Sequence, residues 1–149
     1  MNIRYADIND AVPIAENNVL LAQESEGLSV DFNTVLNGVK AVLSDKTKGF
    51  YVVVEDLNSI IGQLMITFEW SDWNNKNVWW LQSVYIKKSW RRKKIFSQLL
   101  DHVKDIACIH NVDTLRLYVY NDNIKAIETY LARGMKKKSY SIFQLLIEK

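Results

Sequence analysis

In residues 77–110 the spacing of apolar residues changes once, from a pattern typical of a strand to one typical of a helix. This change constrains the fold more than any other feature. Residues 77–86, NVWWLQSVYI, are rich in aromatic and β-branched residues, which predicts a buried strand. Over residues 92–110 the apolar side chains from Ile95 to Ile106 are spaced by four, four and three, which predicts a helix with one buried stripe. Between these patterns, six of the eight residues 87–94 are cationic.

Similar patterns place the other elements along the chain. Further strands are predicted at residues 2–6, 50–56, 59–70, 114–120 and 139–147. Further helices are predicted after Asp10, from Ser29 or Asp31 to Leu43, and over residues 121–134. The order β-α-α-β-β-β-α-β-α-β predicts a mixed α/β fold with a central sheet flanked by helices. Neither a repeat nor a Pro/Gly-rich linker interrupts the pattern, so we expect a single domain over residues 1–149.

Composition and charge narrow the class of protein. With 48% apolar and 11% aromatic residues, a chain of 149 residues can bury a full core. The 19 basic and 17 acidic residues give a net charge of only +2, which argues against a nucleic-acid-binding protein and makes any basic patch local. The start lacks an apolar signal segment, and the stretch IIGQLMITF is too short to span a bilayer. We therefore expect a cytoplasmic protein without a membrane partner.

The single cysteine, Cys108, excludes an internal disulfide and a multi-thiolate zinc site. Its apolar neighbours predict a buried structural thiol. We predict no metal site.

The junction between the strand at 77–86 and the following helix is a candidate anion site. Backbone N–H groups at a helix start lack intrahelical partners, and the helix dipole favours negative charge there. Arg91, Arg92, Lys93 and Lys94 would suit a ligand with several phosphates. The alternative is a solvated helix end, but cations at a helix N-terminus oppose the dipole, and open α/β sheets place ligands where a strand ends.

Two motifs resemble the GNAT superfamily of N-acetyltransferases. Residues 91–96, RRKKIF, take the place of its Arg/Gln-x-x-Gly-x-Gly/Ala motif, with Lys94 at the typical glycine and Phe96 at a small residue. Residues 123–135 match Asn-x-x-Ala-x-x-x-Tyr-x-x-x-Gly-Phe, with methionine for the last aromatic. We expect Lys94 to lie in the first helical turn with an ordinary negative φ, where a side chain can avoid the ligand, and we expect its flexible stem to return the ammonium to a phosphate oxygen.

The resemblance implies transfer of an acetyl group from acetyl-CoA to a primary amine of a small molecule or a peptide. It implies that Tyr130 protonates the departing thiolate, and it implies a cofactor-binding set consisting of Val84, Tyr85, Ile86, Arg91, Arg92, Lys93, Lys94, Ile95, Phe96 and Asn123. A catalytically silent, CoA-binding sensor or scaffold and a nucleic-acid-binding module are the alternatives. A homodimer could form through an exposed final strand at 139–147.

Several of the candidate residues could have a purely structural role instead of a functional one. Tyr130 lies beside an apolar helix stripe and could be a core tyrosine, and Asn123 could simply cap its helix. The strand at 77–86 offers no carboxylate as a general base, so Glu69 and Asp72 are candidates, although each could be a surface carboxylate. By the same resemblance, the acceptor side is built from the first two helices and the loop that joins the two central strands. These segments hold Gln23, Glu24, Glu26, Glu69 and Asp72, which would suit a cationic amine. Of the adjacent Trp79 and Trp80, one must face each side of the sheet.

Overall fold

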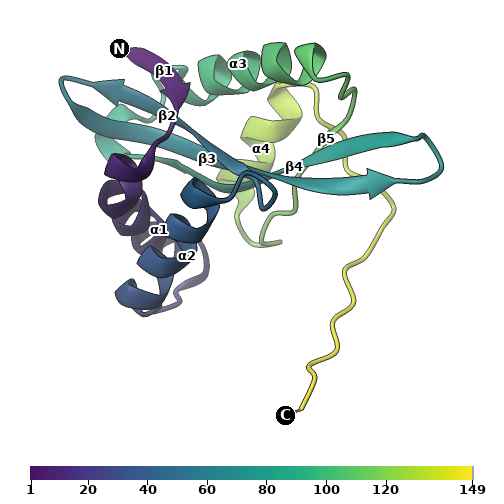
Figure 1. Ribbon diagram of the computed structural model, residues 1–149, viewed down its shortest axis with the longest axis horizontal. Coiled ribbons are helices and arrows are strands. Elements are labelled where there is room, and N and C mark those ends of the chain that lie inside the picture. The colour runs from purple at the N-terminus through teal and green to yellow at the C-terminus, as the bar shows by residue number, and fades with distance from the viewer. Residues whose placement is uncertain (149) are drawn as a thin grey trace.

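The structure, a computed structural model, describes residues 1–148. Within them, one mixed sheet has the spatial order β1-β2-β3-β4-β5 (Figure 1). The strands are β1 (Asn2–Tyr5), β2 (Phe50–Asp56), β3 (Ser59–Ser71), β4 (Lys76–Ile86) and β5 (Leu115–Arg116). The helices are α1 (Ala11–Glu26), α2 (Phe32–Ser44), α3 (Ile95–Ile109) and α4 (Ile124–Ala132), with 3-10 turns η1 (Ile8–Asp10) and η2 (Lys88–Trp90). Strands β1 to β4 are antiparallel neighbours, and β5 pairs parallel to β4. The predicted fold class is confirmed.

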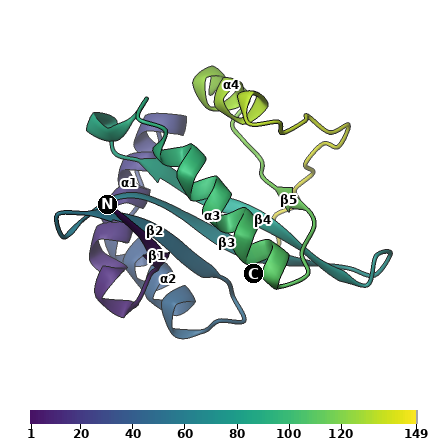
Figure 2. The same ribbon diagram turned by 90° about the horizontal axis from the view of Figure 1, so that it is seen from above.

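Helices cover both faces of the sheet, with α3 on one face and α1 and α2 on the other (Figure 2). Strand β2 shows the consequence, because Val52 and Val54 pack against the α3 side while Tyr51 and Val53 pack against α1 and α2. A strand buried on both faces reads as a continuous apolar run, which explains the sequence YVVV. Within residues 1–148, none of the helices has the length and apolar character needed to cross a membrane.

Side chains and turns fix the ends of several elements. Asp31 caps α2 by accepting a hydrogen bond from the backbone N–H of Thr34 at 2.9 Å, which decides between the two predicted caps. Leu57 and Asn58 both have positive φ, as a two-residue hairpin between β2 and β3 requires. Asp10 precedes α1 as predicted, but its carboxylate binds the Arg4 guanidinium instead of capping the helix.

The C-terminal segment differs most from the sequence prediction. Residues 139–147 form no strand: they run extended from the body of the protein and pair with no other described residue. The strand predicted at 114–120 pairs only at Leu115–Arg116, and the helix predicted from residue 92 begins at Ile95. The apolar pattern correctly indicates extended backbone at 139–147, but a strand also needs a neighbour.

Candidate active site

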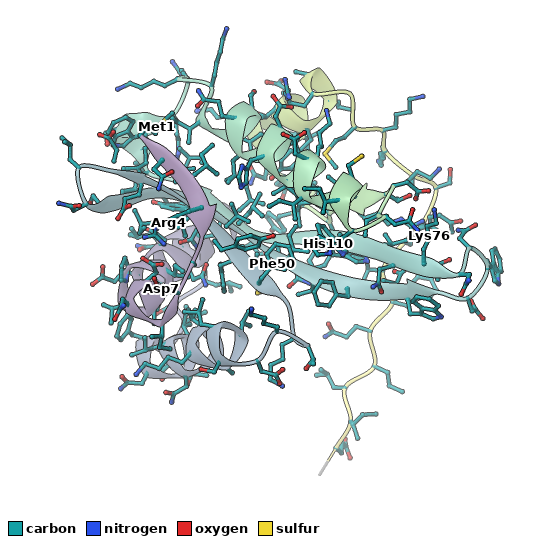
Figure 3. All side chains as sticks on the ribbon, turned by 45° about the horizontal axis from the view of Figure 1, so that its top comes forward. Met1, Arg4, Asp7, Phe50, Lys76 and His110 are labelled. Atoms are coloured by element: carbon teal, nitrogen blue, oxygen red, sulfur yellow. The ribbon has the colours of Figure 1, made fainter. Side chains whose placement is uncertain are left out.

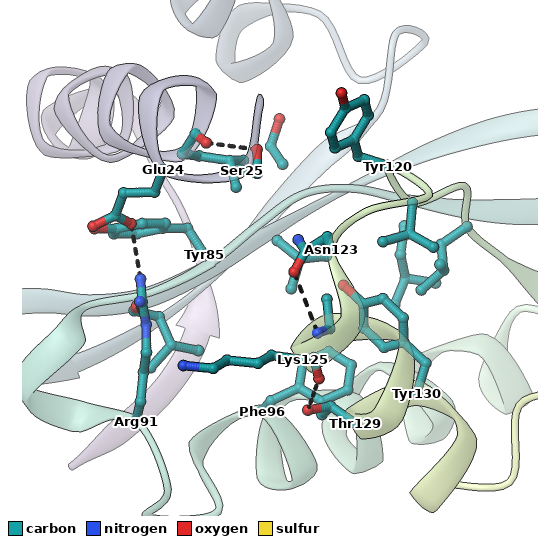
Figure 4. Close-up of a pocket in the computed structure, with 18 of the residues that line it drawn as sticks. Glu24, Ser25, Tyr85, Arg91, Phe96, Tyr120, Asn123, Lys125, Thr129 and Tyr130 are labelled. Atoms are coloured by element: carbon teal, nitrogen blue, oxygen red, sulfur yellow. Dashed lines mark hydrogen bonds and ion pairs between the residues drawn. The ribbon is translucent and has the colours of Figure 1, made fainter. Parts of the chain in front are cut away.

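A cleft opens where β4 and the chain after β5 diverge. Parallel pairing links Trp79 to Leu115 and Trp80 to Arg116 and then stops. Beyond this point, residues 81–86 and 117–120 both line a cleft of about 1370 Å³. Helix α1, the loop after β4, the start of α3 and helix α4 form further walls (Figure 4).

A bulge in β4 accompanies the divergence. Gln63 pairs with Tyr85 and Met65 with Gln82, so two residues of β4 oppose one residue of β3. Ser83, one of the two, has a φ of 51°. From Leu81 to Ile86, β4 therefore pairs with β3 along one edge, while its other edge has no strand partner among the described residues. Unpaired backbone groups along this edge are available to an extended ligand.

The loop between β4 and α3 turns sharply through two left-handed residues. Arg92 has a φ of 63°, and Lys94, the N-cap of α3, has a φ of 61° and a ψ of 20°. The expectation of an ordinary negative φ at Lys94 was wrong, because this residue precedes the first helical turn and reverses the chain into it. A left-handed conformation favours glycine, which gives a physical reason for the glycine that the resembling motif has at this position.

Arg91 is held on the cleft wall by three groups. Its Nε donates to the carbonyl of Ile86 at 2.8 Å, and its guanidinium pairs with the Glu24 carboxylate at 2.9 Å. The guanidinium also lies 5.4 Å from the ring centre of Tyr85. Burial alone would raise the pKa of Glu24, but hydrogen bonds from Arg91 and Lys88 hold this pKa below its usual value. Glu24 is therefore ionised at neutral pH and joins α1 to the basic loop.

Tyr130 and Asn123 project from α4 into the same part of the cleft (Figure 4). The Tyr130 ring meets the Phe96 ring edge-on at 5.5 Å, and burial raises the pKa of its phenol. Tyr130 therefore carries its proton at neutral pH, half-buried between the core and the cleft. Asn123 caps α4 through its Oδ1, which accepts from the N–H of Ala126 at 3.3 Å. Asn123 therefore both caps α4 and lines the cleft.

A buried amide network below the cleft was missed at the level of sequence. Gln63 is fully buried; its Oε1 accepts from Asn17 at 3.0 Å, and its Nε2 donates to Asn18 at 2.8 Å. Asn18 in turn donates to the Tyr51 hydroxyl at 3.2 Å and also lines the cleft. The available signal was a glutamine inside the apolar run IIGQLMI, since a buried amide requires partners.

Most of the residues predicted for cofactor binding line this cleft. The lining residues among them are Val84, Tyr85, Ile86, Arg91, Arg92, Lys94, Ile95, Phe96 and Asn123. Lys93 is the exception, and its ammonium lies 5.0 Å from the ring centre of Trp90. The sequence pattern thus brings one strand end, one loop and one distant helix to a single cavity, although their binding roles stay predictions.

Glu69, Asp72 and Cys108, also singled out in the sequence, do not line this cleft. Glu69 accepts from the Trp80 indole at 3.1 Å and pairs with Arg116 at 3.1 Å beside a separate shallow pocket. Asp72 is exposed at the turn between β3 and β4. Cys108 is exposed on the outer side of α3, so the prediction of a buried thiol was wrong. The α3 stripe that packs on the sheet includes its neighbours Ile106 and Ala107 instead.

Trp79 and Trp80 face opposite sides of β4, as predicted. Trp79 packs in the α3 core, where its ring lies 5.3 Å from Phe50. Trp80 lies on the other face, 6.0 Å from the Tyr118 ring.

The cleft has the features that an extended phosphate-bearing thioester requires. One end has the basic loop 91–94, the middle has the unpaired edge of β4, and Tyr130 provides a protonated phenol on the facing wall. The donor set and the open strand edge therefore fit a cofactor of the acetyl-CoA type.

Comparison with known proteins agrees with this geometry. Thialysine N-epsilon-acetyltransferase from Bos taurus is 29% identical over 75 residues, which cover 50% of this chain and 44% of that protein. The chain thus matches less than half the length of its curated relatives. A possible acetyltransferase from Clostridium difficile 630 superposes with a TM-score of 0.92 at 40% identity, covering 99% of this chain and 98% of that one.

A predicted acetyltransferase with acetyl-CoA from Clostridium acetobutylicum shares the fold, with a TM-score of 0.81 at 17% identity over 97% of this chain and 95% of that one. The sequence pattern of the acetyltransferase (GNAT) family matches residues 19–135, which is most of the chain. With the cleft, the basic loop and the α4 motif in place, this chain belongs to the acetyltransferase (GNAT) family.

Proposed function

We propose that this protein transfers an acetyl group from acetyl-CoA to a primary amine. The observation that carries the proposal is the cleft between β4 and residues 117–120, which has a basic loop at one side and the protonated Tyr130 at the other. Family membership and the similarity to a thialysine N-epsilon-acetyltransferase support it.

Different groups of this chain would bind different parts of acetyl-CoA. The basic loop, with Arg91 oriented by Glu24 and Ile86, would hold the phosphates, and the unpaired edge of β4 would hydrogen-bond the amide-containing arm. When bound, acetyl-CoA supplies an acetyl thioester that a neutral amine can attack. Asn123 would contribute its side-chain amide, since only its oxygen is used in capping α4.

Tyr130 is the catalytic residue of the proposal. A thiol has an ordinary pKa of about 8.5 and a phenol one of about 10, so proton transfer from Tyr130 to the departing thiolate is unfavourable by only about 1.5 pKa units and can accompany cleavage of the C–S bond. The proton that the amine nitrogen loses as the amide forms replaces the one that Tyr130 gives up. Burial raises the pKa of Tyr130 further, which keeps the phenol protonated until that moment. Its contact with Phe96 holds the ring at the cleft wall.

The cleft lining also contains carboxylates that could bind an acceptor. Glu24, Glu26 and Glu128 line the cleft, and Glu24 is already paired with Arg91 and Lys88. Glu26 and Glu128 would attract a cationic amine. We therefore propose a flexible primary amine of the thialysine type as the acceptor. The cytoplasmic location expected from the sequence stays a prediction.

The test is an acetylation assay with acetyl-CoA and a panel of amines, namely thialysine, lysine, a polyamine, an aminoglycoside and a peptide with a free N-terminus. We expect free thiol and acetylated amine to appear in equal amounts with at least one of these amines. The rate of acetylation should be higher for thialysine than for its N-dimethylated analogue. Binding of CoA without turnover of any amine would favour the silent sensor. Absence of both binding and turnover would reject the proposal.

A further inference from the structure

Part of the sheet face that carries α1 and α2 lies beyond these helices. Their apolar contacts reach β3 at Met65, while the hairpin of β3 and β4 extends further (Figure 1). There the register places Thr67 opposite Trp80 and Trp80 opposite Arg116. Paired residues and residues two positions apart share one face of a sheet. Three strands therefore present polar and aromatic side chains on this face, namely Thr67 and Glu69 from β3, Trp80 and Gln82 from β4, and Arg116 from β5.

Hydrogen bonds hold these side chains in place. The Glu69 carboxylate accepts from the Trp80 indole N–H through Oε1 and from Arg116 Nη1 through Oε2, each at 3.1 Å. The Trp80 ring lies 6.0 Å from the Tyr118 ring. The side chains of Arg116 and Glu69 are 38% and 42% exposed, so a guanidinium and a carboxylate lie side by side at the surface. An exposed ion pair adds little to stability, so stability alone does not account for this arrangement.

The shallow pocket of about 390 Å³ beside this ion pair adjoins the cleft. Gln82 and Tyr118 line both cavities. Gln82 donates from its Nε2 to the Thr67 hydroxyl at 2.9 Å, which fixes the side chain at the boundary between them. Three residues of β4 separate Trp80 from the bulge at Ser83, which is a distance of roughly 10 Å at about 3.3 Å per residue. A small extended molecule can therefore reach from the free edge of β4 to Trp80.

We infer that the shallow pocket binds the α-amino-acid end of the acceptor, an inference that rests on the acetyl transfer proposed above. The Arg116 guanidinium binds the α-carboxylate, and the Glu69 carboxylate binds the α-ammonium. The rings of Trp80 and Tyr118 contact the aliphatic stem, which leads the terminal primary amine past Gln82 into the cleft. The acceptor is thus a free amino acid with an amine at the end of its side chain.

Charge complementarity favours this class of acceptor over the others in the panel. A zwitterionic amino-acid end has one positive and one negative group, as the Arg116–Glu69 pair does. A diamine or polyamine would bring a second cation next to Arg116, and a residue inside a peptide has neutral amides where the two charges would be. The pair need not open, because a guanidinium has further N–H donors and each carboxylate oxygen can accept another hydrogen bond.

Calorimetric titration of the CoA-saturated protein tests the pocket through binding alone. The probes are thialysine, its carboxamide and its Nα-acetyl derivative, and thialysine should bind at least about tenfold more tightly than either derivative. Arg116→Met should weaken thialysine about tenfold or more and leave the carboxamide unchanged, because the carboxamide lacks the negative group that Arg116 binds. Glu69→Gln keeps an acceptor for the Trp80 indole, and it should weaken thialysine but not the Nα-acetyl derivative.

Lys76→Met is the matched control. Lys76 lies on the same hairpin (Figure 3), where it pairs with Asp113 at 3.0 Å in another surface ion pair. The dissociation constants of all three probes should stay the same in this variant. An unchanged CoA dissociation constant in each variant would show that the fold is retained.

Turnover distinguishes failure of this inference from failure of the proposed function. Arg116→Met should raise the KM for thialysine about tenfold with little change in kcat, because Arg116 binds a remote part of the substrate. Efficient acetylation of cadaverine, with KM values that Arg116→Met leaves unchanged, would overturn the pocket inference while acetyl transfer stands. Discrimination among the probes without acetylation of any amine would support the pocket and reject acetyl transfer. Thialysine that fails to bind the CoA-saturated parent, or binds no better than its derivatives, would also overturn the inference.

Discussion

Replacing Lys94 by glycine should stabilise the fold relative to replacing it by alanine. Both changes remove the same cation from the start of α3, so the comparison isolates the effect of a Cβ at a φ of 61°. The left-handed conformation costs a residue with a Cβ about 1–2 kcal/mol. Glycine loses about 0.4–1 kcal/mol through its greater freedom in the unfolded chain. We therefore expect Lys94→Gly to exceed Lys94→Ala by about 0.5–1 kcal/mol in free energy of unfolding.

Urea denaturation measures this difference, and thermal unfolding should show it as roughly 1–4 °C in a chain of this size. Lys93 supplies the matched control because its φ is not positive. At that position Lys93→Gly should be less stable than Lys93→Ala by about 0.5–1 kcal/mol. Equal or greater stability of Lys94→Ala over Lys94→Gly would refute the left-handed assignment and the account of the loop built on it.

Three further predictions follow from the site. CoA at a hundred times its dissociation constant should raise the unfolding free energy by about 2.7 kcal/mol through binding to the native state, and a flat thermal shift at saturating CoA would contradict the cleft assignment. Gln63→Met should cost about 2–3 kcal/mol in urea denaturation because it leaves the buried amide of Asn17 without its acceptor, and an unchanged midpoint would show that the network is not formed. Because the folded-state pKa of Glu24 is lowered, its ion pairs stabilise the fold above the ordinary glutamate pKa of about 4.3, and this contribution is lost as the pH falls through the folded-state value. The unfolding free energy of the parent should thus fall more steeply below about pH 5 than that of Glu24→Gln. Parallel pH profiles of the two proteins would contradict this prediction.

The sequence predicts those features that depend on local patterns. The change of apolar period near residue 86 marks the junction of β4 with α3, and the spacing from Asn123 to Tyr130 places both on one helix. The apolar residues at 50–56 predict a strand, and the structure adds that α3 covers one face of β2 while α1 and α2 cover the other.

Features that depend on distant partners were missed. The ion pair between Glu24 and Arg91 joins residues 67 positions apart, and the Gln63 amide network joins β3 to α1. The backbone of Lys94 depends on how β4 and α3 are joined in space, which a helical pattern does not contain. Segment 139–147 has a strand pattern, but whether it pairs depends on an edge that the pattern cannot specify.

The most direct test of acetyl transfer in this cleft is the turnover of Tyr130→Phe with acetyl-CoA and the best amine of the panel. The variant keeps the ring that packs on Phe96 and removes only the hydroxyl. We predict an unchanged CoA dissociation constant by calorimetry and a kcat about ten- to a thousandfold lower, as expected for loss of a general acid. Equal kcat values for parent and variant would contradict the role of Tyr130 as the proton donor.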